Sequence, residues 1–544
     1  MKVLFKGLKK HMPDNETALI HLFTVNHKFV EEYFSTKMWC TLRCVSKGLY
    51  FMLMEPIMDK LRAKQRAHYR EMRHRLILYR CMVDVSIMGC GKTFTTSAIA
   101  KSLNLDLVVF GPYSSQSTWN QAAAHFGITV EFHSYSEFQR KKKPYLTAVE
   151  DPMEWEDAKL LPDCHEQKAL SLTIDPSWIA RIKKPILLVF DESHFLKNVS
   201  KRSKSATILV RSLLAWSSGY VICLSATPFD KPEHTCRLAR VLGILKAQEL
   251  AVMNPFTRNL RYTGLQEIID YAQQLTPMEI PRFYGAQAST KTAYFCMTHM
   301  IKPKLFLSMP AHSLPFIADT KNHFGHLEGN NLETVKQGVN LLRRAIQAFM
   351  LGQQFGGEAM GSVSGGLRMI EIGKVPLFVQ NAQRVLRDYP TAKVTLMFNY
   401  TASLKLAEEH LTMHNPLVIH GPTSKVKRPK LLHFFQQPDC KHRLLICNLS
   451  VLAQGVDLDD QHGAFPRYAF ISPSYHIIAL HQASGRFSRT ETKSKPIIRF
   501  LYVAEVSSEM KLLETLARKS KVIKSGLTYQ VKLPGDYPEE YEID

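Results

Sequence analysis

Short apolar runs recur along this chain in two blocks, and they constrain the fold more than any other feature. The first block contains the runs 105–110, 185–190 and 220–224. The second block contains the runs 394–398, 417–419, 443–447 and 467–471. Longer amphipathic segments separate the runs, which is the pattern of buried parallel strands that alternate with helices. The sequence therefore predicts an α/β protein with two parallel-sheet lobes.

A glycine-rich turn follows the strand-like run 82–85 and precedes a helix-forming segment. The turn reads Met88-Gly89-Cys90-Gly91-Lys92-Thr93. Glycines let backbone N–H groups curl around a phosphate at the start of a helix, and the lysine can reach the β- and γ-phosphates of a nucleotide. The threonine hydroxyl beside it can bind Mg²⁺. Strand, loop and helix in this order predict a phosphate site, with a chance glycine turn as the alternative.

Two adjacent carboxylates end the apolar run 186–190, about a hundred residues after the glycine-rich turn. Asp191 can hold the Mg²⁺ shell, and Glu192 can polarise an attacking water. On its own, an Asp-Glu pair after a strand is often a solvated strand end. Together with the phosphate loop, Asp191 and Glu192 predict a catalytic pair of carboxylates. Thr93 and Asp191 are the predicted metal ligands.

These segments resemble the superfamily-two helicases, and within them the SWI/SNF-type translocases, whose two lobes are RecA-like. The run Asp191-Glu-Ser-His194 through Lys197-Asn198 is similar to that group's DEAH-x-x-KN segment, with Ser193 where alanine is usual. Ser225-Ala-Thr227-Pro228 is similar to the helicase motif that couples hydrolysis to nucleic-acid contact, where the SWI/SNF group usually has Thr-Gly-Thr. Ser86 stands where the group has an acid, so the resemblance is to a divergent member of the group. The resemblance implies that ATP and Mg²⁺ are used.

The resemblance also assigns roles to residues outside the phosphate loop and the carboxylate pair. Gln65 would read the adenine of ATP. Residues that would couple the site to nucleic acid are Ser114, Trp119, His194, Ser225, Thr227 and Gln482. Other interpretations stay open, because a tryptophan is more often a core residue and Gln65 lies in a basic helix that would ordinarily be a solvated face. Ser225 and Thr227 could merely cap the next helix.

The second block of strands carries the rest of the resemblance. Gln482-Ala-Ser-Gly485-Arg486-Phe-Ser-Arg489 has the family spacing of one glutamine and two arginines, and Gly455 and Asp457 are similar to a motif near the γ-phosphate. A guanidinium from a separate lobe can stabilise charge on the γ-phosphate during its transfer. The candidate catalytic residues are therefore Lys92, Asp191, Glu192, Arg486 and Arg489. An amphipathic helix with exposed arginines is the alternative.

Five regions are expected from these patterns. They are a helical N-terminal extension (1–60), a first lobe (61–242), an insertion between the lobes (243–372), a second lobe (373–530) and a flexible acidic tail (531–544). Residues 18–53 faintly resemble an F-box bundle, which would bind a protein partner, whereas a basic helical cap on the first lobe is the alternative. An extension joined to a compact motor also resembles the helicases of large DNA viruses, including poxvirus transcription-associated ATPases.

The charge of the chain favours a polyanionic partner. Its 70 Lys and Arg against 48 Asp and Glu give a formal charge of +22, and nucleic acid would release counterions on binding such a surface. A highly soluble surface without a partner is the alternative. The ten cysteines form no Cys-x-x-Cys pair, which favours an intracellular, reducing compartment without choosing between nucleus, viral factory and virion. No run approaches the roughly 20 apolar residues of a membrane helix, so no membrane partner is expected.

Three classes of function can be compared at this point. The leading hypothesis is an enzyme that hydrolyses ATP and translocates on or unwinds nucleic acid, with DNA favoured over RNA, in transcription, replication or repair. The second is an ATP-gated scaffold or adaptor that has lost hydrolysis, which the intact Lys92, Glu192 and Arg486 argue against. The third is a P-loop kinase or GTPase, which the second lobe with its paired arginines argues against.

Overall fold

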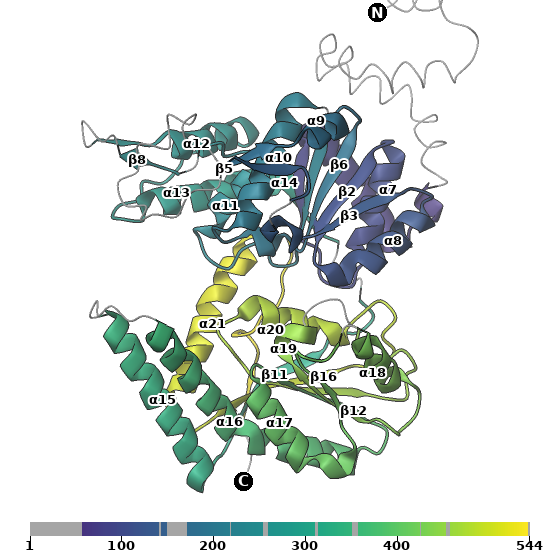
Figure 1. Ribbon diagram of the computed structural model, residues 1–544, viewed down its shortest axis with the longest axis vertical. Coiled ribbons are helices and arrows are strands. Elements are labelled where there is room, and N and C mark those ends of the chain that lie inside the picture. The colour runs from purple at the N-terminus through teal and green to yellow at the C-terminus, as the bar shows by residue number, and fades with distance from the viewer. Residues whose placement is uncertain are drawn as a thin grey trace, which may run out of the picture. The chain divides into compact units, whose positions relative to one another are not determined.

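A computed structural model describes most of the chain (Figure 1). The described residues are 57–140, 143–149, 171–217, 219–247, 249–253, 259–309, 314–350, 357–424, 426–452 and 457–541. The chain divides into two compact units, 1–60 and 61–544. The F-box-like segment proposed for 18–53 lies outside the described residues. The second unit contains both blocks of apolar runs.

The first block forms a six-stranded parallel sheet in the order β10-β1-β7-β6-β2-β3. Its strands are β1 (Cys81–Asp84), β2 (Asp106–Gly111), β3 (Val130–Ser134), β6 (Ile186–Asp191), β7 (Tyr220–Leu224) and β10 (Phe306–Leu307). Helix α6 (Ala63–Tyr79) precedes the first strand, and the helices between the strands are α7 (Lys92–Ser102), α8 (Gln116–His125), α9 (Pro176–Ile182), α10 (Lys201–Trp216) and α11 (His234–Val241). Every residue of β1 and β6 is buried, as expected for central strands covered on both faces.

The second block forms a seven-stranded parallel sheet in the order β13-β14-β12-β15-β16-β11-β17. Its strands are β11 (Asp319–Gly325), β12 (Lys393–Phe398), β13 (Leu417–Ile419), β14 (Leu444–Asn448), β15 (Arg467–Ile471), β16 (Ile497–Val503) and β17 (Glu539–Tyr541). Its helices include α16 (Gly357–Asp388), α17 (Thr401–His410), α18 (Lys427–Gln436), α19 (Leu449–Leu452), α20 (Ile477–Ser484) and α21 (Ser507–Ser525). The predicted α/β fold with two parallel-sheet lobes is confirmed.

The region 243–372 is divided differently from the expected insertion. β10 extends the first sheet beside β1, and β11 is an inner strand of the second sheet. Before β10 lie α12 (Thr263–Leu275), α13 (Ala288–Phe295), a π-helical turn (Cys296–Ile301) and α14 (Lys302–Leu305). The two strands are short or half polar in sequence, so their own pattern is weak. Pairing with an existing sheet makes them strands.

The acidic end of the chain is also more ordered than expected over its described part. β17 pairs in parallel with β11. Glu540 in β17 forms ion pairs with Lys321 of β11 at 3.1 Å and with Arg499 of β16 at 2.6 Å. The expectation of a flexible tail is therefore wrong for 539–541, because basic side chains on the neighbouring strands compensate the acids.

Helix α21 contacts both lobes. Near its start, Glu509 forms a buried ion pair of 2.6 Å with Lys374 of α16. At its end, the carbonyl oxygens of Ser525 and Leu527 accept hydrogen bonds from Lys302 Nζ at 2.6 and 3.2 Å. The chain after the second lobe therefore returns to the first lobe before it forms β17 (Figure 1).

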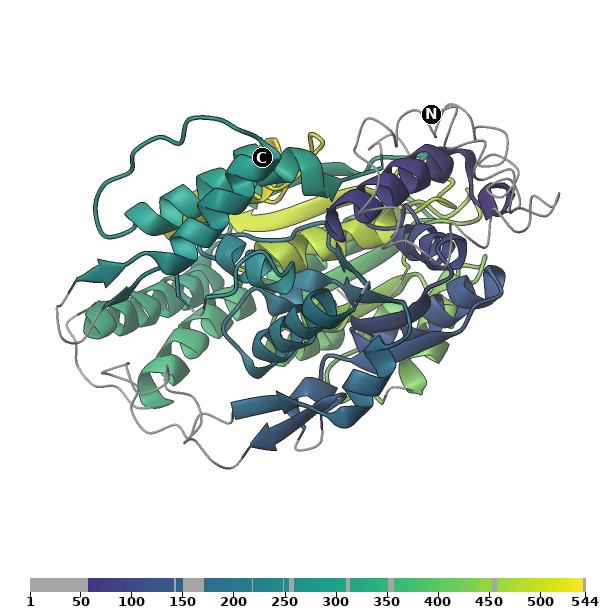
Figure 2. The same cartoon turned by 90° about the horizontal axis from the view of Figure 1, so that it is seen from above.

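Two smaller sheets complete the described architecture. β4 (Leu146–Val149) and β5 (Ser171–Ile174) form an antiparallel pair that lies at the rim of the view in Figure 2. β8 (Val252–Met253) and β9 (Leu260–Arg261) form the other antiparallel pair. Within the part of the chain that the structure describes, no helix is both long and apolar enough to cross a bilayer.

Helices α15 (Gly329–Met350) and α16 cross at glycines. A Cβ added to Gly338 of α15 would lie 2.8 Å from the carbonyl oxygen of Gly366 and 2.9 Å from the amide nitrogen of Ile370, both in α16. A Cβ added to Gly361, also in α16, would meet nothing within 4 Å. The two backbones therefore approach closely at Gly338 and leave no room for a side chain.

Gly338→Ala is expected to destabilise the protein, because the two helices must move apart to admit the methyl group. Overpacking of this kind costs roughly 1–3 kcal/mol. The matched control is Gly361→Ala, which should be neutral or stabilise by up to about 1 kcal/mol because alanine favours a helix. Urea unfolding followed by circular dichroism measures both. Equal stability of the two variants would contradict the close crossing.

Candidate functional site

The glycine-rich turn joins β1 to α7 and has the geometry of a phosphate cradle. Gly89 and Gly91 adopt φ values of 78° and 94°, in the left-handed region that favours glycine. No side chain caps the start of α7, so its first N–H groups remain for an anion. Lys92 Nζ donates to the carbonyl oxygens of Ser86 and Ile87 at 2.7 and 3.1 Å. The lysine therefore lies over the loop.

Side chains from two other segments lie in close contact with this loop. A Cβ on Gly91 would lie 2.1 Å from Gln65 Nε2, and a Cβ on Gly89 would lie 2.6 Å from Arg489 Cδ. A Cβ on Gly485 would likewise lie 2.4 Å from Cε of Met88. Residues of the second lobe thus reach the phosphate loop of the first. A side chain at Gly89, Gly91 or Gly485 would have to displace Arg489, Gln65 or Met88, respectively.

Gln65 lies on the buried face of α6 and not on a solvated face. Its Nε2 donates to the carbonyl oxygen of Cys90 in the loop at 3.1 Å, while its Oε1 accepts from the backbone N–H of Arg62 at 3.1 Å. The side chain is 7% exposed. The amide is therefore held against the loop, in a place where it could face a bound base.

Asp191 ends β6 in the first lobe and has two aromatic neighbours. Trp119 Nε1 donates to its Oδ2 at 2.9 Å, and Tyr135 donates its O–H to the Asp191 carbonyl oxygen at 2.8 Å. Burial, followed by the charge of Glu192, raises the pKa of Asp191. A bound cation would relieve this unfavourable charge.

Trp119 was predicted among the residues that couple the site to nucleic acid, with a core position as the alternative. The side chain is fully buried, so direct contact with a nucleic acid is excluded. Its fused rings are in the core and its single N–H is used on Asp191. Trp119 can therefore act only by holding the carboxylate.

Glu192 has a strained backbone and a partner from the second lobe. Its φ is 51°, which is uncommon for a residue with a side chain and is concentrated at functional sites. Gln482 Nε2, on α20, donates to Glu192 Oε2 at 3.2 Å. His194 Nδ1 lies 3.3 Å from the same oxygen. Burial opposes ionisation, but His194, Lys92 and Arg486 outweigh it and lower the pKa of Glu192 to about 2.

His194 links this carboxylate to the segment Ser225–Pro228. Its Nδ1 lies 3.3 Å from Ser225 Oγ, and Gln482 Nε2 lies 3.5 Å from its Nε2. Ser225 Oγ also accepts from the backbone N–H of Thr227 at 3.2 Å. The next helix, α11, begins only at residue 234. The two hydroxyl residues therefore belong to the loop network and do not cap a helix.

The two arginines of the second lobe lie at the same site. Arg489 Nε is 2.5 Å from Asp457 Oδ1, and its NH1 donates to the carbonyl oxygen of Gly485 at 2.5 Å. Arg486 is 7% exposed. Burial, followed by the charge of Arg489, lowers the pKa of Arg486 to about 10, which leaves it protonated at neutral pH. Gly455, which was predicted beside Asp457, lies outside the described residues.

In the described part of the chain, two of the predicted side-chain hydroxyl groups make no hydrogen bond at this site. The hydroxyl oxygens of Ser114 and Thr227 are buried, and neither has a hydrogen-bond partner within the residues that the structure describes. Ser114 lies in a short 3₁₀ turn after β2. Their predicted roles toward nucleic acid stay predictions.

Thr93 and Asp191 fit a magnesium ion that is bound mainly by nucleotide phosphates. Thr93 is the second residue of α7, directly after the cradle, and Asp191 is a buried carboxylate with a raised pKa. Mg²⁺ in such sites needs only one or two protein oxygens because phosphates and water supply the rest. Among the described residues, no group of three or more His, Cys, Asp or Glu side chains forms a separate metal site.

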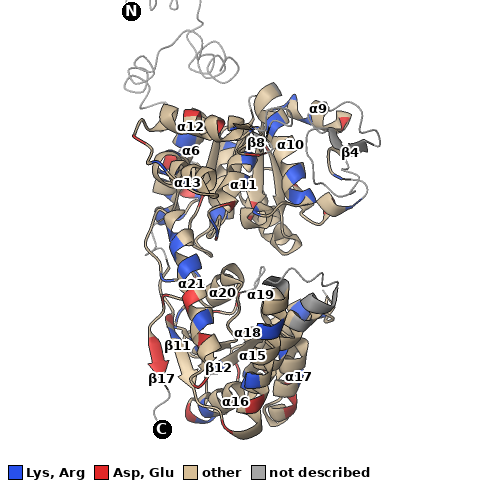
Figure 3. Ribbon diagram, turned by 90° about the vertical axis from the view of Figure 1, so that its left-hand side faces the viewer, with Lys and Arg blue, Asp and Glu red and all other residues tan. Residues whose placement is uncertain are grey.

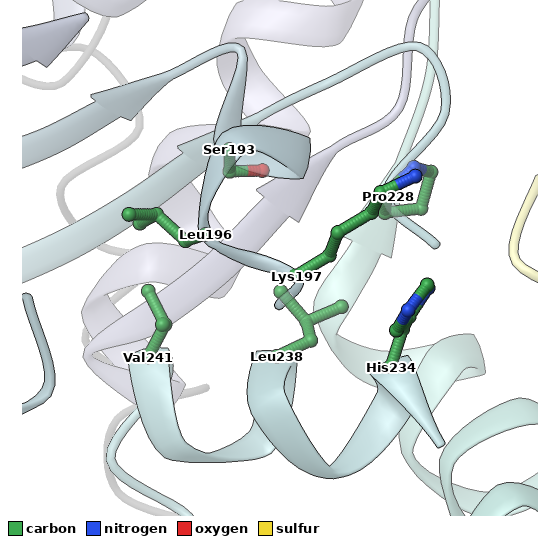
Figure 4. Close-up of a pocket in the computed structure, with 7 residues that line it drawn as sticks. All are labelled: Ser193, Leu196, Lys197, Pro228, His234, Leu238 and Val241. Atoms are coloured by element: carbon green, nitrogen blue, oxygen red, sulfur yellow. The ribbon is translucent and has the colours of Figure 1, made fainter. Parts of the chain in front are cut away.

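A small pocket lies beside the carboxylate segment. Figure 4 shows the side chains that line it, which are Ser193, Leu196, Lys197, Pro228, His234, Leu238 and Val241. At its edge Asp230 Oδ1 lies 2.7 Å from Lys197 Nζ and 2.8 Å from His234 Nδ1. The pocket includes none of the residues predicted to bind the nucleotide.

Two buried residues beside the loop were missed in the sequence. Asp84 lies in β1 and His68 in α6, and their side chains meet at 3.1 Å. A carboxylate inside the apolar run 82–85 and a histidine three residues after Gln65 were the available signals. Residues three apart share one face of a helix, so His68 points the same way as Gln65.

Comparison with known proteins gives a distant but long similarity. No known protein-family profile matches the chain. A protein of Acanthamoeba polyphaga mimivirus, described as a putative ATP-dependent RNA helicase, is 20% identical over 487 residues, which cover 85% of this chain and 82% of that protein. Among solved structures, the Sulfolobus solfataricus SWI2/SNF2 ATPase core in complex with dsDNA is 14% identical, with a TM-score of 0.29, over 87% of this chain and 97% of that one.

Trp119→Phe should destabilise the protein more than Trp178→Phe. Both tryptophans are fully buried, but Trp119 donates to a carboxylate whereas Trp178 Nε1 donates to the hydroxyl of Ser212 at 2.7 Å. Hydrogen bonds to charged groups contribute about 1.5–3 kcal/mol, against about 0.5–1.5 kcal/mol for neutral pairs. Urea midpoints at neutral pH measure the difference. Equal losses would mean that the bond to Asp191 contributes no more than a neutral one.

Proposed function

We propose that this chain, a divergent superfamily-two helicase-type ATPase, uses ATP hydrolysis to move along nucleic acid. The observation that carries the proposal is the meeting of two lobes at one carboxylate. Gln482 from the second lobe donates to Glu192 of the first, and Arg486 contributes to the lowered pKa of the same group. A site assembled from two lobes can respond to nucleotide by changing how the lobes meet.

Binding of ATP is assigned to the loop and its neighbours. The N–H groups at the start of α7 and the ammonium of Lys92 would hold the phosphates, after Lys92 exchanges the carbonyls of Ser86 and Ile87 for phosphate oxygens. Gln65 would face the adenine. Thr93 and Asp191 would hold Mg²⁺, which supplies positive charge at the phosphate oxygens when it is bound.

Hydrolysis is assigned to Glu192 and the two arginines. Because the pKa of Glu192 is about 2, the carboxylate is ionised at neutral pH and can accept a hydrogen bond from an attacking water. Arg486 and Arg489 would stabilise the charge that develops on the γ-phosphate. Arg489 is held by Asp457 in this structure, so its use at the phosphate requires it to exchange that partner.

Coupling is assigned to the chain of polar contacts that leaves Glu192. It passes through His194 to Ser225, and Gln482 contacts both Glu192 and His194. A change in the position of Gln482 would therefore alter the hydrogen bonds of the hydrolytic carboxylate and of the Ser225–Pro228 loop together. This arrangement can make the rate of ATP turnover depend on whether nucleic acid is bound between the two lobes.

Nucleic acid is the proposed track because of charge. The formal charge of +22 suits a polyanion, and Figure 3 shows Lys and Arg on α10, α15 and α21. DNA is proposed over RNA on the resemblance to SWI/SNF-type translocases. The mimivirus relative is named for RNA and the solved structure contains dsDNA, so the polymer is decided by experiment.

The biological setting belongs to the same proposal. An ATP-driven motor on DNA would serve transcription, replication or repair, inside the cell or in a viral factory. The cysteines within the described ranges are all free, which is in keeping with a reducing compartment. A protein partner for the N-terminal extension is proposed on the F-box resemblance alone.

Lys92→Ala should abolish ATP hydrolysis, because it removes the charge that the phosphates need. Glu192→Gln should retain ATP but not turn it over, because only the activation of water is lost. A matched control is Glu131→Gln, a carboxylate of β3 that binds Arg181 and His133 away from the loop. Phosphate release and nucleotide retention on a filter are measured side by side. Parental turnover by either site variant would refute the assignment.

Nucleic acid should stimulate the ATPase, with double-stranded DNA as the best activator. The apparent affinity should fall steeply as salt rises, because phosphate contacts release counterions. Turnover is measured with single- and double-stranded DNA and RNA at several salt concentrations.

Each outcome of that titration has a clear meaning. Stimulation by single-stranded RNA alone would assign the protein to RNA. Turnover that no polymer stimulates would reject a motor on nucleic acid, and ATP binding without turnover would favour an ATP-gated scaffold.

A further inference from the structure

Asp84 is a carboxylate in the core of the first lobe, on the strand that leads into the phosphate loop. It is the last residue of β1 and has no exposed surface. An isolated charge at such a depth would be very costly unless it is paired and hydrogen-bonded. Its two carboxylate oxygens therefore need partners, and the identity of these partners is informative.

One oxygen binds the helix that carries Gln65. His68 Nε2, on α6, lies 3.1 Å from Asp84 Oδ2, and the two side chains are 2% and 0% exposed. Gln65 and His68 lie one helical turn apart on the buried face of α6. The bond from Asp84 thus holds the same face of α6 that touches the loop at Cys90.

The other oxygen binds the first residue of the loop. Asp84 Oδ1 accepts from the backbone N–H of Ser86 at 2.9 Å and from Ser86 Oγ at 2.5 Å. The Ser86 carbonyl oxygen in turn accepts from Lys92 Nζ at 2.7 Å. The carboxylate therefore fixes the peptide on which the phosphate-binding lysine rests.

Ser86 extends the contact to the segment that joins the two lobes. Its Oγ accepts from the backbone N–H of Met309 at 2.7 Å. Met309 is fully buried and follows β10, before the chain continues to β11 of the second sheet. One serine hydroxyl thus donates to Asp84 and accepts from the segment between the sheets.

The backbone of Asp84 completes the junction. Its carbonyl oxygen accepts from the N–H of Ser225 at 3.1 Å, at the start of the loop assigned to coupling. Through its side chain and its carbonyl, Asp84 is therefore bonded to α6, to the phosphate loop and to the coupling loop, and through Ser86 to the segment between the sheets.

The carboxylate stays charged despite its burial. Burial alone would raise the pKa of Asp84, but His68, Lys92 and Ser86 together outweigh it and the pKa is lowered. A depressed native pKa means that this group adds stability above its unfolded pKa, and that the contribution is lost as pH falls through the native pKa. Asp84 is accordingly ionised at neutral pH.

We propose that Asp84 is a positioning residue that sets the geometry of the phosphate loop and ties it to the segment between the lobes. The inference rests on the proposed function in one respect, that the loop binds ATP. Asp84 would touch no substrate. It would act through Ser86 on the peptide beneath Lys92 and through His68 on the helix that carries Gln65.

A simpler interpretation is that the buried contact between Asp84 and His68 contributes only to stability. The two interpretations differ in what a folded variant does with ATP. If the contact is purely structural, its loss lowers the melting temperature and leaves the affinity for ATP unchanged. If Asp84 is a positioning residue, its replacement weakens ATP binding in protein that is still folded.

Asp84→Asn, His68→Leu and His68→Gln separate these interpretations. The amide of Gln can place an N–H near the position of His68 Nε2, whereas Leu cannot. The matched control is Glu509→Gln, which alters another buried carboxylate, held 2.6 Å from Lys374 Nζ in the second lobe. The measurements are ATP dissociation constants by fluorescence titration, KM and kcat, and a thermal melt of every variant.

We expect Asp84→Asn and His68→Leu to raise the ATP dissociation constant and KM by roughly tenfold or more, the size of effect that small misplacements produce. His68→Gln should stay close to the parental affinity. Glu509→Gln should lower the melting temperature while the affinity for ATP stays parental. Comparisons are made on variants that melt cooperatively, and the two His68 variants give the answer if Asp84→Asn does not fold.

Parental affinity in folded Asp84→Asn, or equal affinities of the two His68 variants, would overturn the proposal. Binding of ATP by the parental protein without turnover would refute the proposed hydrolysis, while the dissociation constants would still test Asp84. Failure of the parental protein to bind ATP would refute both.

Discussion

The architecture of the site depends on one constraint, that all strands of a parallel sheet end at the same edge. β1, β7 and β6 are neighbours in the first sheet, so the loops that follow them emerge side by side, although about a hundred residues or more separate β1 (Cys81–Asp84) from β6 (Ile186–Asp191) and β7 (Tyr220–Leu224). These three loops hold Lys92, the Ser225–Pro228 segment and the Asp191-Glu192 pair. The phosphate cradle, the coupling loop and the carboxylates meet because of strand order, as in other open α/β sheets.

Buried charge is the second organising feature, and it explains why so many polar contacts converge on these loops. Asp84 and Asp191 are buried, the Glu192 side chain is 21% exposed, and the pKa of each is shifted by its surroundings. Asp84 and Glu192 have enough cationic partners to stay ionised. Burial and the charge of Glu192 raise the pKa of Asp191, and the hydrogen bond from Trp119 only partly offsets them. The least compensated carboxylate is the one assigned to the metal, which is where an added positive charge would be most stabilising.

Much of the fold and of the site could be predicted from local patterns. The apolar runs gave the central strands to within a residue or two, since fully buried strands are apolar throughout. The phosphate loop was recognisable because its glycines are required by backbone geometry, with φ of 78° and 94°. β10, β11 and β17 were not recognised as strands. They have weak patterns of their own and gain their structure from pairing with neighbours, as Glu540 does with Lys321 and Arg499.

The sequence by itself determined the residue types, their order and the local geometry of the nucleotide loop, because these follow from the chemistry of short segments. Only the tertiary structure decided which side chains meet. The pairing of Asp84 with His68, the use of the Trp119 N–H on Asp191 and the approach of Gln482 to Glu192 each join residues from different elements. Such contacts depend on strand order and helix packing, which bring distant segments together. The spacing of residues within one segment therefore does not predict them.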